Sequence, residues 1–361
     1  MQLFAGRENS FSIILPAYGV EEYISNALDD ILSQTYSNWE AIVVDDCSPD
    51  ASGEIAKRYA KKDSRIKVIS HDHNRGLSAA RNTGLGLAQG SYVWFPDPDD
   101  RYEKELLNQV AGSLQSHKSP VVLIGHREDY FSSSGEYERS VDFVLNGSFL
   151  DQEHLRNAVI DLERQTQYGY AWNKIYSRQY LLDGKYSFVE DLPLIEDIEF
   201  NIRVFQNLSS LNIVSAPLYH YAKREKANLT NKFVPRYYEV HRKRIQLLRD
   251  QQYSWGLLSD DVKAVLGMLF ARYILSALER NCDPQSNMKH SQRVAWCKEV
   301  FQDELFKELI PFAKADSAVL NACIKALRKQ SVSECLALGS VIHHAKRSVL
   351  HDVFLKLKGK R

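Results

Sequence analysis

The chain has 361 residues, of which 44% are apolar, and its 46 basic side chains are balanced by 46 acidic ones. This length predicts about two domains, with a core large enough to fold without a disulfide or a structural metal. The balanced charge argues against a protein that binds nucleic acid over its whole surface. The five cysteines form no C-x-x-C pair, which argues against a zinc or dithiol site and favours a reducing compartment.

The sequence also bears on localisation. The N-terminus lacks the basic and apolar segments of a signal peptide. The longest apolar stretch, 264–271, is too short to span a membrane and is flanked by Lys263 and Arg272. We therefore expect a soluble cytoplasmic protein.

Short apolar runs alternate with helical patterns over the first hundred residues. Strands are predicted at 11–15, 41–44, 66–69 and 92–95, and helices at 24–32, 51–62 and 77–88. A further strand is predicted at 121–124, and almost everything after 234 has helical periodicity. This order predicts an α/β fold, with a doubly wound, mostly parallel sheet flanked by helices and followed by an all-helical extension.

Acidic clusters follow two of the predicted strands, at 45–46 and at 97–100. Ligands of open α/β sheets bind just beyond the carboxyl ends of the strands. Pro98 favours an extended Asp97, and side chains two residues apart in an extended segment point to the same side. Asp97 and Asp99 are thus candidate ligands for a hard cation such as Mg²⁺ or Mn²⁺. A capped turn, in which Asp and Pro are common, is the alternative.

A third acidic pair, Glu196-Asp197, opens an amphipathic helical pattern. Acidic residues favour helix N-termini, so a capping role is the alternative to a catalytic one. The earlier pair Glu190-Asp191 competes for the catalytic role.

The segment 73–82 combines glycine, asparagine and arginine around the predicted start of a helix. Backbone N–H groups and a guanidinium at such a place can hold phosphate. The chain has neither G-x-G-x-x-G nor a P-loop, which argues against dehydrogenases and NTPases.

Taken together, these motifs resemble the family 2 glycosyltransferases of the GT-A fold, notably the bacterial enzymes that build cell-surface polysaccharides. The matching segments are 12–18, 34–36, 43–48, 74–82, 95–100, 172–174, 196–200 and 219–221. The resemblance is close over 11–105 and looser to about 230. It implies a Rossmann-like GT-A domain over 1–230 that binds a nucleotide-sugar and carries catalysis. The helical domain over 231–361 would then contact the acceptor, a membrane surface or another subunit.

The resemblance implies a donor site for a nucleotide-sugar, usually a UDP-sugar. The implied donor contacts are Pro16, Ala17, Tyr18, Glu21, Asp46, Arg81, Asp97 and Arg224. Of these, Asp46 would bind the base, and Arg81 and Arg224 would lie near the diphosphate. Asp97 and Asp99 would form the D-x-D motif that binds Mn²⁺ or Mg²⁺, with Asp99 as the direct ligand.

The resemblance also implies a catalytic base and an acceptor side. Asp197 would be the base, because Phe200 follows it by three residues, as in the family motif. The acceptor side would be shaped by Trp172, Lys174 and Glu196. In the 219–221 segment, His220 is expected to be a strand histidine between aromatic residues rather than a metal ligand.

The chain departs from the family pattern at three places. Cys47 stands where glycine is common, and Pro98 replaces the usual serine of the D-x-D motif. A small insertion at 192–195 precedes the candidate base. No carboxylate of the motifs is lost.

The implied reaction is an inverting, metal-dependent transfer of a sugar to a hydroxyl group of a glycan or lipid-linked acceptor. The base removes the proton of the acceptor hydroxyl, and the metal neutralises the leaving nucleoside diphosphate. One alternative is a non-catalytic nucleotide-sugar-binding or scaffold subunit of a polysaccharide assembly complex. Another is a sugar nucleotidyltransferase, which the single glycine and absent lysine of segment 16–20 disfavour.

The C-terminal segment 341–361 places apolar residues on one helical face and carries six basic side chains against one acidic one. A basic amphipathic helix of this kind can lie on an anionic membrane surface. The alternatives are a terminal helix packed on its own domain with a solvated tail, and a contact within a homo-oligomer. No nucleic-acid partner is expected.

Overall fold

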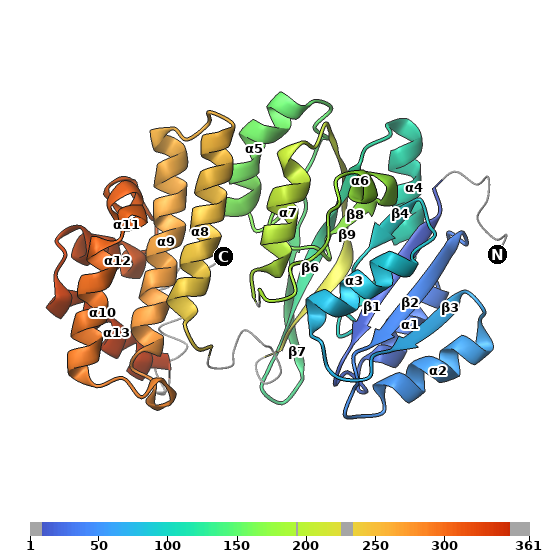
Figure 1. The fold of residues 1–361 in the computed structure, drawn as a ribbon, viewed down its shortest axis with the longest axis horizontal. Helices are drawn as coiled ribbons and strands as arrows, with labels where there is room; N and C mark the ends of the chain where they lie inside the picture. The colour runs from blue at the N-terminus through green and yellow to red at the C-terminus, as the bar shows by residue number, and fades with distance from the viewer. Residues whose placement is uncertain (1–8, 193, 225–233, 347–361) are drawn as a thin grey trace. The chain divides into compact units, whose positions relative to one another are not determined.

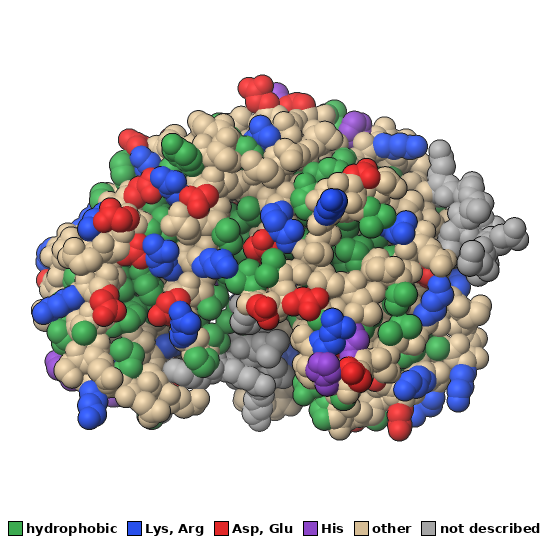
Figure 2. All heavy atoms as spheres, viewed as in Figure 1, with side chains coloured by type: hydrophobic (Ala, Val, Ile, Leu, Met, Phe, Trp, Pro, Cys, Tyr) green, Lys and Arg blue, Asp and Glu red, His purple; other side chains and the backbone are tan. Residues whose placement is uncertain are grey.

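The computed structural model describes residues 9–192, 194–224 and 234–346. The chain divides into two compact units, residues 1–228 and 229–361, which are drawn in Figure 1. Acidic and basic side chains are interspersed over the face shown in Figure 2.

The first unit is built on one sheet of nine strands. The strands are β1 (Phe11–Ala17), β2 (Trp39–Asp45), β3 (Ile66–Ser70), β4 (Tyr92–Trp94), β5 (Arg101–Tyr102), β6 (Val121–Phe131), β7 (Tyr137–Phe143), β8 (Lys174–Ser177) and β9 (Leu211–Arg224). Their order in the sheet is β3-β2-β1-β4-β8-β6-β9-β5, and β7 pairs with β6.

The sheet is parallel in its first half and mixed in its second. Strands β3, β2, β1 and β4 pair in parallel, as predicted. Beyond them, the short β8 lies antiparallel to both β4 and β6, whereas β6 and β9 are parallel. The expected α/β fold is therefore confirmed, but the sheet is mostly parallel only where strand and helix alternate regularly in the sequence. The carboxyl ends of β1, β2 and β4 meet at one edge.

Helices cover both faces of this sheet. They are α1 (Ile24–Leu32), α2 (Ser52–Lys62), α3 (Leu77–Leu87), α4 (Leu106–Ser116), α5 (Gln152–Arg164), α6 (Arg178–Asp183) and α7 (Glu196–Gln206). In β1, Ile13 packs in one core cluster with Ile31 of α1, whereas Ile14 faces Gly84 of α3. A Cβ at position 84 would lie 2.3 Å from Ile14 Cγ2, so the glycine lets α3 approach the sheet closely.

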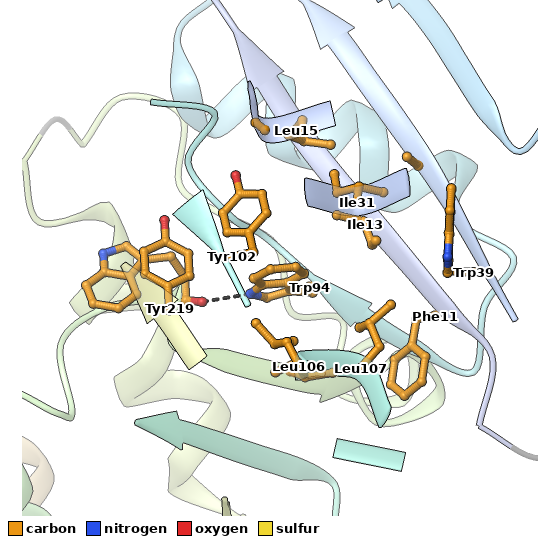
Figure 3. Close-up of a cluster of buried hydrophobic side chains, with 14 of the residues drawn as sticks. Phe11, Ile13, Leu15, Ile31, Trp39, Trp94, Tyr102, Leu106, Leu107 and Tyr219 are labelled. Atoms are coloured by element: carbon orange, nitrogen blue, oxygen red, sulfur yellow. Dashed lines mark hydrogen bonds between the residues drawn. The ribbon is translucent and has the colours of Figure 1, made fainter. Parts of the chain in front are cut away.

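An aromatic cluster lies behind the end of β4 (Figure 3). The indole of Trp94 packs against the rings of Tyr102 and Tyr219, and its Nε1 donates to the carbonyl oxygen of Trp172 over 2.7 Å. Trp172 in turn stacks on Tyr219, with 4.4 Å between the ring centroids. The cluster therefore holds the segment before β8, which contains Trp172, against β5 and β9. This contact lies at the edge of the sheet where the acidic segment begins.

The second unit is helical throughout its described part, as predicted. Its helices are α8 (Tyr237–Ser254), α9 (Asp260–Arg280), η2 (Pro284–Ser286), α10 (His290–Gln302), α11 (Glu304–Leu309), η3 (Ile310–Phe312), α12 (Ala318–Arg328) and α13 (Val332–Lys346). The predicted apolar stripe of α9 is core, since Leu266, Leu269, Phe270 and Ile274 are buried. Helix α9 packs against α8, α11, α12 and α13.

Two predictions about membranes concern the helical unit. Within the described residues, none of the helices combines the length and apolar character needed to cross a bilayer. The predicted basic helix over 341–361 lies outside the described residues from 347 onward.

His126 of β6 is a buried histidine without hydrogen bonds from either ring nitrogen. Its ring stacks on Phe143 at 4.9 Å and meets Trp172 edge-on. Burial lowers the pKa of His126 to about 4. Between this value and the ordinary pKa of about 6.5, the unfolded chain binds the proton and the folded chain does not. The stability contributed by this residue is therefore lost as the pH falls through that window.

The substitution His126→Phe keeps the stack and removes the titration. Between pH 7 and pH 4, we expect the wild type to lose about 3 kcal/mol more unfolding free energy than the variant. Urea denaturation at both pH values measures the difference. His73→Phe, which removes an exposed histidine, is the control and should keep the wild-type slope. Equal pH dependence of wild type and His126→Phe would contradict the prediction.

Candidate active site

The acidic segment after β4 forms a turn. The N–H of Asp100 donates to the carbonyl of Asp97 over 3.2 Å. The buried carboxylate of Asp100 accepts hydrogen bonds from the Tyr219 hydroxyl (2.6 Å) and the Ala222 N–H (2.9 Å). Asp100 thus fixes the turn that the sequence offered as an alternative at 97–100. The carboxylates of Asp97 and Asp99 remain partly exposed.

Arg81 of α3 joins two of the predicted acidic clusters. Its side chain is only 1% exposed. One guanidinium nitrogen donates to Asp97 over 3.0 Å, and the other donates to Asp197 of α7. Burial opposes the charge of Arg81, but the carboxylates of Asp197 and Asp97 raise its pKa, so the guanidinium stays protonated. Its buried ion pairs make Arg81 a residue that positions the two carboxylates, and its expected place near the diphosphate stays a prediction.

Helix α7 carries Asp197 into this site. The second oxygen of Asp197 accepts a hydrogen bond from the Ala171 N–H over 2.9 Å. One helical turn later, the buried ring of Phe200 stacks on Phe188 at 4.1 Å and anchors the helix. The competing Asp191 lies on the exposed surface. The structure therefore brings Asp197, rather than Asp191, beside the D-x-D segment.

Glu196 lies next to Asp197 and has a buried oxygen, Oε2, with no hydrogen-bond partner. Burial and the charge of Asp197 raise the pKa of Glu196 to about 7. Burial, together with the charges of Asp99 and Asp197, raises the pKa of Asp97 to about 7 despite Arg81. Three carboxylates thus surround one guanidinium, and this surplus of negative charge favours a cation.

A divalent cation suits the donors at this site, because carboxylate oxygens are the ligands that hard ions prefer. Asp97 and Asp99 are the chain's candidate ligands. Within residues 9–192, 194–224 and 234–346, no group of three or more His, Cys, Asp or Glu side chains could hold a metal by itself. Mg²⁺ commonly takes one or two carboxylates and completes its shell with water and substrate phosphates.

Arg224, at the end of β9, lies against the D-x-D segment. Its Nη2 donates to the carbonyl oxygen of Asp99 over 2.7 Å, and its Nη1 is 3.7 Å from the Asp99 carboxylate. The guanidinium also lies over the ring of Tyr23, 4.4 Å from the centroid. The positive charge of Arg224 therefore lies beside Asp99, where it would offset the negative charge of a diphosphate bound through that residue.

The predicted base-binding residues at the end of β1 are buried, whereas those that follow the strand are exposed. Pro16 and Ala17 are buried, because helices cover both faces of the sheet. The carbonyl of Ala17 accepts hydrogen bonds from Asp46 N–H and the Ser48 hydroxyl. Tyr18 is 51% exposed and offers a ring to a ligand. Pro16 and Ala17 thus belong to the core, and the expected contact of Tyr18 with the base stays a prediction.

Asp46 and Glu21 hold loops together. The buried carboxylate of Asp46 accepts hydrogen bonds from Arg75 N–H (2.8 Å) and Gly76 N–H (2.7 Å) and lies 2.7 Å from His71 Nδ1. Asp46 thus holds the loop before α3 in place, and its expected hydrogen bond to the base stays a prediction. The carboxylate of Glu21 accepts the N–H at the start of α2 over 2.9 Å.

Cys47 adopts φ +57°. This left-handed conformation favours glycine, which explains why glycine is common at this place in the family pattern.

Trp172 and Lys174, which were expected on the acceptor side, are both buried, since each is at most 2% exposed. The ammonium of Lys174 donates to the carbonyls of Gln167 and Tyr168 at 2.9 Å and of Tyr170 at 2.7 Å. They shape the loop that carries the Ala171 N–H to Asp197, and their expected role in shaping the acceptor side stays a prediction.

Two half-buried tyrosines pack against Trp172: Tyr221 belongs to the matching segment 219–221, whereas Tyr170 lies in none of the matching segments. Tyr170 stacks on Trp172 at 4.7 Å, and Tyr221 lies 5.3 Å from the same ring. The signal available in the sequence was the spacing of aromatic residues in 168–172 and 219–221. His220, between Asp129 (2.8 Å) and Glu103 (3.0 Å), is the strand histidine that was expected.

Comparisons with known proteins bear on the family and the fold of the chain. The model of the family described as glycosyl transferase family 2 matches residues 12–181. The chain is 34% identical over 218 residues to the uncharacterized glycosyltransferase EpsJ of Bacillus subtilis, covering 60% of this chain and 61% of EpsJ. It is 30% identical to the poly(ribitol-phosphate) beta-N-acetylglucosaminyltransferase TarS of Staphylococcus aureus, covering 64% of this chain and 39% of TarS. These matches thus reach about three fifths, or less, of each relative.

A solved structure supports the fold. The crystal structure of TarS residues 1–349 in complex with UDP-GlcNAc superposes with a TM-score of 0.61 at 20% identity. The superposition covers 94% of this chain and 91% of that one. The architecture of this GT-A-like neighbour is therefore shared.

The paired guanidinium gives a stability prediction. Arg81→Met leaves two partly buried carboxylates without their counter-charge, so we expect a loss of about 3–5 kcal/mol of unfolding free energy, measured by urea denaturation. Arg75→Met removes a half-exposed arginine that lies 3.8 Å from Glu190 and should change stability by less than about 1 kcal/mol. A loss in Arg81→Met no larger than in Arg75→Met would show that the buried pairs do not stabilise the fold.

Proposed function

The chain belongs to glycosyl transferase family 2 through residues 12–181, and we propose that it transfers a sugar from a UDP-sugar to a hydroxyl group of an acceptor. The acceptor would be a glycan or a lipid-linked saccharide in the synthesis of a bacterial cell-surface polysaccharide. The observation that carries this proposal is the joining of Asp97 and Asp197 by Arg81. Asp97, a proposed metal ligand, and Asp197, the proposed base, are thereby held at one place, as a transferase that needs both requires.

The donor side of the proposed reaction involves the metal ligands, an arginine and an exposed tyrosine. Asp97 and Asp99 would hold Mn²⁺ or Mg²⁺, which when bound supplies positive charge to the leaving diphosphate. Arg224 would add a second positive charge beside Asp99. On the donor side, the exposed ring of Tyr18 would contact the base of the nucleotide.

Asp197 would remove the proton of the acceptor hydroxyl as that oxygen attacks the anomeric carbon. Arg81 and the Ala171 N–H fix the orientation of this carboxylate. Direct attack with a single base inverts the anomeric configuration, and no covalent glycosyl-enzyme forms, unlike in retaining hydrolases. The half-buried Tyr170 would support the acceptor beside the base. Because the motif carboxylates are all present, we place catalysis ahead of a scaffold role.

The donor and the metal can be tested together. Purified protein is incubated with UDP-GlcNAc and other UDP-, GDP-, CDP- and dTDP-sugars, with Mn²⁺, with Mg²⁺ or with EDTA, and nucleoside diphosphate release is followed. UDP-GlcNAc comes first because TarS was solved in complex with it. We expect metal-dependent UDP release that falls at least about 100-fold in Asp99→Ala, because a proposed ligand of the metal is lost.

Asp72→Ala, which removes an exposed aspartate, is the matched control and should release UDP at the wild-type rate. When no sugar is hydrolysed, calorimetry measures UDP binding with Mn²⁺ present. Absence of both turnover and binding would overturn the donor site.

The assignment of the base is tested by two neighbouring isosteric changes. Asp197→Asn should lower kcat by about 10²–10⁴ while the Kd for UDP stays within about threefold. Glu196→Gln should lower kcat by less than about tenfold, because Glu196 has no bond to Arg81 or to Ala171. The opposite ranking would make Glu196, with its unpartnered Oε2, the base.

A further inference from the structure

The helical unit has a pocket of its own, about 650 Å³ in volume. It is formed by side chains of α8, of α10 and of the first residues of α11. This volume lies in the range of sites that bind small molecules. None of the residues implicated in sugar transfer contributes to it.

Two half-buried aromatic rings, Tyr238 and Trp296, line the pocket. They meet edge to face, with 5.3 Å between their centroids. Tyr238 is also nearly parallel to the buried ring of Phe270, at 6.0 Å. The aromatic wall is therefore anchored on the core of the unit and offers a ligand a fixed surface.

Polar groups of the pocket are also held in place. Asp303 accepts hydrogen bonds from both Arg242 Nε and Arg242 Nη2, the latter over 2.9 Å. The Tyr238 hydroxyl donates to the same carboxylate over 3.1 Å, and so does the Leu305 N–H over 2.9 Å. Fixed donors and acceptors of this kind can orient a ligand at little entropic cost.

The charge of the lining restricts the ligand. Four acidic side chains line the pocket, against two basic ones. Arg242 is already paired with Asp303, so a phosphate or another anion would meet net repulsion. The carboxylates of Glu239 and Glu299 can accept hydrogen bonds from hydroxyl groups.

We propose that this pocket binds a neutral oligosaccharide. A sugar ring presents an apolar C–H face, which suits the rings of Tyr238 and Trp296, and hydroxyl groups, which suit the surrounding carboxylates. Such binding does not depend on the transfer chemistry of the first unit. In a chain that extends a glycan, the pocket would hold saccharide units other than the one that reacts.

The test is calorimetric titration of the full chain with chitotetraose, cellotetraose and maltotetraose, and with poly(glycerol phosphate) as the anionic comparison. We expect at least one neutral tetrasaccharide to bind, with a Kd that saturating UDP leaves unchanged. Trp296→Ala should weaken this binding by about tenfold or more, and Trp296→Phe, which keeps an aromatic surface, should weaken it less. Circular dichroism confirms that both variants are folded.

Tyr253→Ala, which removes an exposed tyrosine of α8 outside the pocket, is the matched control and should bind as the wild type does. Three results would overturn the proposal: no neutral saccharide binds, Trp296→Ala binds as tightly as the wild type, or poly(glycerol phosphate) is preferred. UDP binding is measured on the same samples, so a failed pocket and a failed donor site are distinguished.

Discussion

A buried guanidinium shared by two carboxylates holds the candidate active site together. Charge is costly to bury unless it is paired and hydrogen-bonded. Arg81 satisfies this condition only when α3, the turn after β4 and the start of α7 are all in place. The same ion pairs therefore stabilise the fold and set the relative position of Asp97 and Asp197, the two carboxylates on which the proposed chemistry depends.

The surroundings of Arg81 leave negative charge in excess. Burial raises the pKa values of Asp97, Asp99, Asp100 and Glu196. Asp100 is compensated by hydrogen bonds within the turn, whereas Asp97 and Asp99 remain partly exposed. A site of this kind is fixed in shape but electrostatically incomplete. This imbalance is the physical reason to expect a divalent cation and a diphosphate to bind together.

Several residues of the family motifs are buried and hold the loops of the site in place. Asp46 holds the N–H groups of Arg75 and Gly76, and Lys174 holds the carbonyls of the loop before β8. Buried backbone groups need partners, so loops that present a few contacts to a ligand need charged or polar residues beneath them. A motif therefore contains both residues that contact the ligand and residues that hold the loops in place. The second kind is recognised by its burial.

The sequence by itself determined the features that depend on local pattern. Strand and helix periodicity located β1 to β4, the helices between them and the core stripe of α9, and parallel strands placed two acidic clusters at one edge. Other features depend on packing between distant segments, which only the tertiary structure decided. Arg81 meets Asp197 across 116 positions of sequence, β8 enters antiparallel, and the pocket of the helical unit joins α8 to α10. The burial of Asp46 and Lys174 likewise follows from what packs around them, because polarity alone does not tell a ligand contact from a satisfied interior group.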